Sequence, residues 1–175
     1  MLDPSWLRPA APPDERLSVV RAGIASPELN RFLYTAVGGG WFWTDRLGWT
    51  FAAWREYLAR PELETWVASL DGAPAGYFEL EQQAAGSVEI AYFGLLPQFT
   101  GRRIGAYLLS VATARAWSLW PPATRRVWLH TCDLDSPIAL KNYQARGFRL
   151  FKTESETVTL PAVTPGPWPG AGQVT

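Results

Sequence analysis

Apolar side chains recur along this chain at two spacings, one typical of strands and one typical of helices. Residues 77–81 alternate apolar and polar side chains, as a half-buried strand does. From residue 104 the apolar positions recur every three or four residues, which predicts a helix that packs one face on a sheet and ends near Trp120, just before Pro121-Pro122. The apolar positions of this helix are Ile104, Leu108, Val111, Ala112 and Leu119. Together the two spacings predict an α/β protein.

Strand and helix signals alternate along the rest of the chain. Ser26-Pro27 predicts the capped start of a helix over residues 26–37, and Ser136-Pro137 predicts the same for residues 136–146. A further helical pattern ends near Pro61. Strands are expected over residues 16–24, 65–70, 77–81, 87–95, 127–131 and 148–156. Because strands on either side of the long helix must be parallel to be joined by a crossover, we expect one mixed sheet, antiparallel first and parallel in its middle.

Both ends of the chain are rich in proline or glycine and lack a periodic apolar pattern. Residues 1–14 are expected to form an irregular leader, and residues 161–175 an irregular Pro/Gly-rich tail. No repeat or linker interrupts residues 15–160, and a chain of 175 residues is long enough to bury a real core. We therefore expect a single domain over residues 15–160.

The charge and cysteine content exclude several classes of protein. Sixteen basic and 16 acidic residues give a net charge of zero, so the chain has no electrostatic footprint for nucleic acid or an anionic membrane. No apolar run approaches the roughly 18 residues that a membrane-spanning helix needs. The single cysteine, Cys132, has no partner for an internal disulfide, and the first residues lack the apolar run of a signal peptide. We expect a cytoplasmic protein without nucleic-acid or membrane partners.

A glycine-bearing turn between the strand at residues 87–95 and the long helix is the strongest chemical signal. The first amides of a helix have no intrahelical acceptors and carry partial positive charge, so such a turn suits a diphosphate. Arg102 and Arg103 oppose the helix dipole at a cost of about 0.3 to 1 kcal/mol each, which a bound anion would relieve. The alternative is an ordinary turn with both arginines in solvent. We favour a phosphorylated ligand.

Two segments resemble the Gcn5-related N-acetyltransferase (GNAT) superfamily. They are Glu89-Ile90-Ala91-Tyr92-Phe93-Gly94-Leu95 with the turn that follows, and residues 136–148 with Tyr143 and Gly147-Phe148. The resemblance spans about residues 26–154 and implies an antiparallel meander that leads into a splayed parallel strand pair flanked by helices. It implies acetyl-CoA as the co-substrate, no metal, and transfer of the acetyl group to a primary amine by direct attack in a ternary complex.

The resemblance also implies which residues bind coenzyme A. They are Phe93, Gly94, Leu95, Leu96, Thr100, Gly101, Arg102, Arg103, Ile104, Gly105, Ala106 and Asn142. A glycine inside a strand often marks a bulge or a close approach, so the splay is expected at Gly94. Thr100 stands where the family has Gln or Arg, and Arg103 stands where it has Gly. These departures keep a noncatalytic acyl-CoA-binding or regulatory module as the alternative function.

Three side chains are the main candidates for proton transfer, and Glu79 and Glu81 on the adjacent strand are weaker candidates for the base. By resemblance Tyr143 is the general acid that protonates the leaving thiolate, and packing on a helix face is its alternative role. Glu89 is the first candidate for the base and His130, the only histidine, is the second. Strict alternation places Glu89 on the face opposite Ile90 and Tyr92. Either base candidate also has a structural alternative as an ordinary strand residue.

The chain has ten tryptophans, several of them crowded between residues 41 and 54. By resemblance this segment bounds the pocket for the acceptor, a small-molecule or peptide amine. Aromatic faces beside a carboxylate suit a cationic amine. The candidates for acceptor binding are Trp41, Trp43, Asp45 and Glu79. The alternative is that the aromatic residues form core packing or the contacts of a homodimer.

Overall fold

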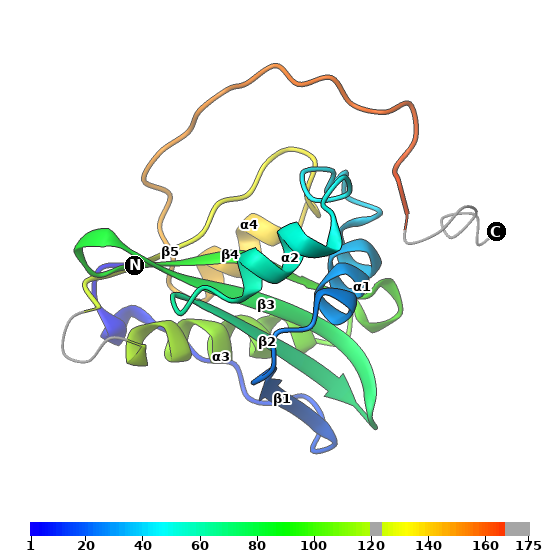
Figure 1. Cartoon of the computed structure of the whole chain (residues 1–175). Coiled ribbons are helices and arrows are strands. Elements are labelled where there is room, and N and C mark those ends of the chain that lie inside the picture. The colour runs from blue at the N-terminus through cyan, green and yellow to red at the C-terminus, as the bar shows by residue number, and fades with distance from the viewer. Residues whose placement is uncertain (120–123, 167–175) are drawn as a thin grey trace.

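The centre of the molecule is a five-stranded mixed sheet. The computed structural model describes residues 1–119 and 124–166. Its strands are β1 Leu17–Arg21, β2 Leu63–Leu70, β3 Ala73–Gln83, β4 Ser87–Leu95 and β5 Arg126–Trp128, in the order β1-β2-β3-β4-β5. Neighbours from β1 to β4 are antiparallel, whereas β4 and β5 are parallel. The expected α/β mixed sheet is therefore confirmed (Figure 1).

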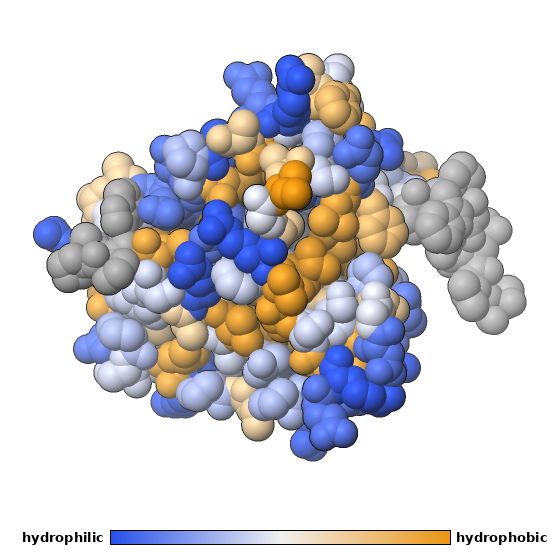
Figure 2. All heavy atoms as spheres, turned by 60° about the horizontal axis from the view of Figure 1, so that its bottom comes forward, coloured by the Kyte–Doolittle hydropathy of each residue, from blue (hydrophilic) through white to orange (hydrophobic). Residues whose placement is uncertain are grey.

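Helices cover both faces of this sheet. The helices are α1 Pro27–Gly38, α2 Phe51–Leu58, α3 Ile104–Ser118 and α4 Ala139–Ala145. Glu64 bonds to Arg115 of α3, whereas Thr65, the next residue of β2, bonds to Asn30 of α1. Because successive strand residues point to opposite faces, α1 and α3 lie on opposite sides of the sheet. Figure 2 brings the lower side of Figure 1 forward and shows an apolar band bordered by hydrophilic residues.

Capping residues explain where two of the helices begin. The Ser26 hydroxyl accepts a hydrogen bond from the Leu29 amide at 3.3 Å, with Pro27 in the first helical position, as predicted. Thr50 caps α2 in the same way, through the Ala53 amide at 3.2 Å. The predicted cap at Ser136 is wrong, because α4 begins three residues later and has no side-chain cap.

The parallel strand pair separates early. Pairing of β4 with β5 ends at Glu89 opposite Trp128, so residues 90–95 of β4 have no parallel neighbour. The splay was expected at Gly94, but the strands separate earlier, after Glu89. Gly94 has another reason to be glycine: a Cβ there would lie 2.3 Å from Cγ1 of Val37, so α1 packs directly against this point of the backbone.

A β-bulge at Ala91 overturns the strict alternation expected for β4. Leu80 of β3 pairs with Ile90, but Glu79 pairs with Tyr92, which leaves Ala91 without a partner. Tyr92 therefore lies on the same face as Glu89 rather than on the face of Ile90. This shift brings the Tyr92 ring against Tyr34 of α1 and against Trp43 in the segment that follows α1.

The predicted strand at residues 148–156 is wrong. Residues 149–160 have no partner in the sheet, and Leu150 and Phe151 are 64% and 62% exposed. The outer edge of β5 is already taken: the Val127 amide donates to the Met1 carbonyl at 2.9 Å, and the Met1 nitrogen donates to the Val127 carbonyl at 2.6 Å. The segment instead arcs away from the sheet (Figure 1) and returns at Gly166, whose amide donates to the Gly39 carbonyl.

The expectations for the two ends of the chain and for the end of the long helix can be compared with the structure only in part, because residues 120–123 and 167–175 are not described. The leader has one short 3₁₀ turn, Pro4–Trp6, and the Ala10 amide donates to the Ser110 hydroxyl of α3. The long helix ends at Ser118, and its predicted stop at Trp120 and Pro121-Pro122 lies outside the described residues, as do residues 167–175 of the tail. Within the described residues, no helix is long and apolar enough to cross a membrane.

Candidate active site

The turn between β4 and α3 presents a row of backbone amides. A short 3₁₀ turn, Pro97–Phe99, leads into it, and the Thr100 hydroxyl donates to the Pro97 carbonyl at 2.8 Å, which closes the turn. Within the described residues, the amides of residues 101–105 donate to no acceptor. Five consecutive amide groups at a helix N-terminus form a site for an anion.

Arg103 occupies a backbone position that favours glycine. It is the N-cap of α3 and has φ +62° and ψ 1°, in the left-handed region. This conformation costs a non-glycine residue about 1–2 kcal/mol. Arg102 and Arg103 are both exposed, and the Arg102 guanidinium lies 5.7 Å from the Phe99 ring. Both arginines therefore precede α3 instead of lying in its first helical turn, where they were expected.

The splayed end of β4 meets α4 at Tyr143. The Phe93 ring contacts the Tyr143 ring edge-on at 6.1 Å, and Asn142 donates from Nδ2 to the Gly105 carbonyl at 3.4 Å. These contacts join β4, α3 and α4 in one place, where Leu95 also lies close to Gly105; Leu96, the next residue, is buried. Burial raises the pKa of Tyr143, and the Asp135 carboxylate raises it further, so the phenol stays protonated at neutral pH.

On the other face of the sheet, Glu89 and His130 form a pair. His130 Nδ1 lies 3.0 Å from Glu89 Oε1, and Gln83 donates from Nε2 to Glu89 Oε2 at 2.7 Å. Glu89 is 8% exposed, whereas the His130 side chain is 69% exposed. The hydrogen bond to Glu89 raises the pKa of His130, and the carboxylates of Asp135 and Asp45 raise it further. The structure thus brings the two base candidates together as one unit.

Glu79 lies apart from these residues. It is 0% exposed, and its carboxylate accepts from Arg46 at 2.9 Å, the Tyr57 hydroxyl at 2.8 Å and Asn30 at 3.1 Å. Its oxygens are therefore occupied by donors of the chain itself. The structure places Glu79 in a buried network and not on a surface that an acceptor can reach, so we do not propose it as an acceptor ligand.

The crowded aromatic residues enclose a cation that belongs to the chain. The Arg46 guanidinium carbon lies 4.0 Å from the ring centres of Tyr57 and Tyr92 and 4.8 Å from that of Trp49. Burial alone would lower the pKa of Arg46, but the Glu79 carboxylate raises it, so the guanidinium stays charged. The aromatic faces of Trp49, Tyr57 and Tyr92 are thus filled by Arg46.

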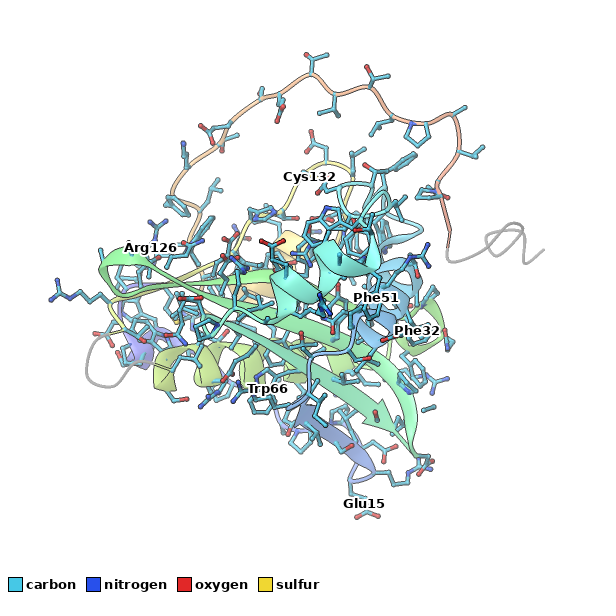
Figure 3. All side chains as sticks on the ribbon, in the orientation of Figure 1. Glu15, Phe32, Phe51, Trp66, Arg126 and Cys132 are labelled. Atoms are coloured by element: carbon cyan, nitrogen blue, oxygen red, sulfur yellow. The ribbon has the colours of Figure 1, made fainter. Side chains whose placement is uncertain are left out.

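The other acceptor candidates lie at the edge of this cluster. Trp43 packs on the rings of Tyr34, Tyr77 and Tyr92, whereas Trp41 is half-buried and Asp45 is exposed. Cys132 lies on the loop between β5 and α4, and Arg126 at the start of β5 (Figure 3). Of the four acceptor candidates, Asp45 is exposed, Trp41 and Trp43 are half-buried, and Glu79 is fully buried.

Sequence reasoning missed Arg46, Gln83 and Trp128. The local signal for Arg46 was present, because it is the one basic residue between Trp43 and Trp49. Gln83 and Trp128 carry no such signal. Their roles depend on three neighbouring strands that bring residues 83, 89 and 128 together.

Comparison with known proteins agrees with this architecture. The family model for the acetyltransferase (GNAT) family matches residues 28–148. No curated protein sequence matches the chain. The structure of the aminoglycoside acetyltransferase meta-AAC0020 from an uncultured soil metagenomic sample, in complex with sisomicin, is similar with a TM-score of 0.67. Identity is 13%, over 85% of this chain and 99% of that one.

Two further solved structures are similar in fold. One is the aminoglycoside N-acetyltransferase AAC(6')-Iy, which has been solved with a bisubstrate analog and also with CoA. The structure with the bisubstrate analog has a TM-score of 0.60. Identity is 19%, over 82% of this chain and 97% of that one. A putative acetyltransferase, YycN, from Bacillus subtilis has a TM-score of 0.59 and 15% identity over 82% of this chain and all of its own. At these identities the likeness concerns the fold.

Proposed function

Because the chain belongs to the acetyltransferase (GNAT) family, we propose that it transfers an acetyl group from acetyl-CoA to a primary amine by direct attack in a ternary complex. The observation that carries the proposal is the order of features along β4. Glu89, near the start of β4, pairs with His130; the strand then loses its parallel neighbour, and the turn after it presents the unbonded amides of residues 101–105. A base, a gap between strands and an anion site therefore follow one another along β4 and the turn that leads from it into α3.

The proposal assigns each part of coenzyme A to a part of the chain. The amides of residues 101–105, with Arg102 and Arg103 beside them, bind the diphosphate. The pantetheine arm lies along residues 93–96, whose backbone on the β5 side is open after the splay. Asn142 supports this arrangement by tying α4 to the start of α3.

The reaction needs one proton to leave the amine and one to reach the leaving group. The amine nitrogen attacks the thioester carbonyl carbon, so that a C–N bond forms and the C–S bond breaks. The Glu89–His130 pair takes the proton from the amine, and Tyr143 gives a proton to the coenzyme A thiolate. The raised pKa of Tyr143 means that the phenol is protonated at neutral pH.

We propose a small-molecule amine as the acceptor. Two of the solved structures with a similar fold are aminoglycoside acetyltransferases, and aminoglycosides carry several ammonium groups. Asp45 and Asp135 act on His130 together with Glu89, so three carboxylates lie around the proposed base. Their negative potential attracts a cationic amine.

Calorimetric titration tests the ligand, with ATP and NAD as matched controls. We expect heat of binding with acetyl-CoA only, and no heat with acetyl-CoA contradicts the proposal. Thiol release with a panel of amines that includes an aminoglycoside then tests turnover. Binding without thiol release for any amine supports the second candidate, a noncatalytic acyl-CoA-binding module, which the strained arginine at position 103 favours.

A further inference from the structure

The side chain of Gln83, at the end of β3, lies between Glu89 and Trp128. The Trp128 indole Nε1 donates to Gln83 Oε1 at 3.1 Å, and Gln83 Nε2 donates to Glu89 Oε2 at 2.7 Å. An indole N–H is a donor only, so the amide atom that faces it must be the oxygen. Trp128 therefore sets the orientation of the Gln83 amide, and the amide nitrogen is directed at Glu89.

The same logic extends from Glu89 to His130. With Oε2 occupied by Gln83, Glu89 presents Oε1 to His130 Nδ1 at 3.0 Å. A carboxylate accepts hydrogen bonds, so neutral His130 keeps its proton on Nδ1 and leaves the lone pair on Nε2. Within the described residues, His130 Nε2 makes no hydrogen bond, and the imidazole is the exposed member of the pair.

We propose that His130 Nε2 is the atom that takes the proton from the acceptor amine, and that Glu89, Gln83 and Trp128 are positioning residues behind it. The inference rests on the proposed function and sharpens it, because it chooses between the two base candidates. Glu89 holds the imidazole in the required tautomer, Gln83 holds Glu89, and Trp128 holds Gln83. Each residue acts through the next one.

Other charged groups act on this relay. Glu81 lies opposite Glu89 in the β3–β4 register, but Arg60 pairs with it at 2.8 Å and offsets its charge. Asp45 and Asp135 act on His130 from the loops after α1 and β5. The Arg126 guanidinium carbon lies 5.5 Å from the centre of the Trp128 ring. Variants of Gln83 leave all of these charges in place, so they isolate the relay.

The single histidine makes the tautomer directly measurable. In the full chain without a histidine tag, ¹⁵N NMR of the imidazole reports His130 alone. We expect the neutral ring to carry its proton on Nδ1 and to lose this preference in Glu89→Gln. A neutral ring protonated on Nε2 in the native protein overturns the proposal. This readout needs no turnover, so it separates failure of the relay from failure of the proposed function.

Kinetics test the order of the relay. With an active amine, we expect His130→Gln to lower kcat about 100-fold or more, the lower range for a general base. Gln83→Leu is expected to lower kcat about tenfold, the size of one charge-assisted hydrogen bond, and Trp128→Phe by less. Gln83→Glu places a second carboxylate against Glu89, so the midpoint of the pH–rate profile should rise. A His130→Gln variant that keeps full kcat, or an unmoved midpoint in Gln83→Glu, overturns the assignment.

Discussion

Glu79 and Glu89 are the same residue type on neighbouring strands and the same face of the sheet, yet their surroundings differ. Glu79 is fully buried and bonded to Arg46, Tyr57 and Asn30, whereas Glu89 is paired with an imidazole that is largely exposed. The partner of Glu79 carries a permanent charge, and the partner of Glu89 titrates near neutral pH. Burial with a permanent partner makes a structural ion pair, while a titrating, exposed partner makes a site for proton transfer.

The largest effect is expected from breaking the buried pair. Arg46→Met leaves the Glu79 carboxylate buried without its cation, so the free energy of unfolding should fall by about 3–5 kcal/mol. Urea denaturation of the native chain and of Arg46→Met measures this difference in the free energy of unfolding. The matched control is Arg16→Met, which removes an exposed partner of Asp14 and Asp71 and should change stability by less than about 1 kcal/mol. Equal losses in the two variants would contradict a structural role for Arg46.

The direct contrast between the two carboxylates is Glu79→Gln against Glu89→Gln. Glu79→Gln leaves Arg46 buried without a counter-charge and should lower the free energy of unfolding by about 3 kcal/mol. Glu89→Gln should lower it by less than about 1 kcal/mol, because its partner is exposed.

Activity should show the opposite order, measured as kcat of the folded fraction. Glu89→Gln is expected to lose about tenfold or more, since the imidazole is no longer held in one tautomer. Glu79→Gln is expected to keep kcat within a few-fold. A Glu79→Gln variant that folds stably and is inactive would place Glu79 in the catalytic machinery.

Features that depend on neighbouring residues in the sequence could be predicted. Local signals sufficed for the start of α1 at Ser26-Pro27 and for β4, whose predicted bounds of residues 87–95 agree with the structure. A helix cap or a strand pattern is set by a few neighbouring residues, so it can be read from the sequence alone. The crossover rule then gave the parallel pair of β4 and β5.

Features that depend on distant parts of the chain could not be predicted in this way. The sequence of residues 148–156 led to the prediction of a strand, but it does not show that Met1 occupies the edge of β5. The bulge at Ala91 depends on the register of β3 against β4. The bulge in turn places Tyr92 on the face of Glu79 and Glu89, where its ring packs against the Arg46 guanidinium. The identities of Glu79 and Glu89 gave no indication that one would be locked and the other accessible.

Arg103, at the N-cap of α3, offers a smaller test. Arg103→Gly removes the left-handed strain of an arginine at φ +62° but loosens the unfolded chain, so the net gain in stability should be about 0.5–1 kcal/mol. The variant also loses a cation beside the unbonded amides, so the Kd for acetyl-CoA should rise several-fold in calorimetry. Arg103→Asn tolerates the left-handed conformation without the charge and should show the same weakened binding. Tighter binding in both variants would mean that the arginine obstructs the diphosphate.

The smallest effect is the pH dependence of stability that the Glu89–His130 pair adds. The pKa of His130 is raised in the folded state, so its contribution is complete below the unfolded pKa of about 6.5 and is lost as pH rises through the folded value. Because the imidazole is 69% exposed and solvent screens the pair, the loss should stay below about 0.5 kcal/mol. Urea titrations at pH 6 and pH 8.5 should show it in the native chain but not in Glu89→Gln, which keeps the histidine and removes its charged partner. Glu79 is bonded to Arg46, Tyr57 and Asn30 and not to the Glu89–His130 pair, so Glu79→Gln should keep the dependence; its disappearance there would mean that the two carboxylates are coupled.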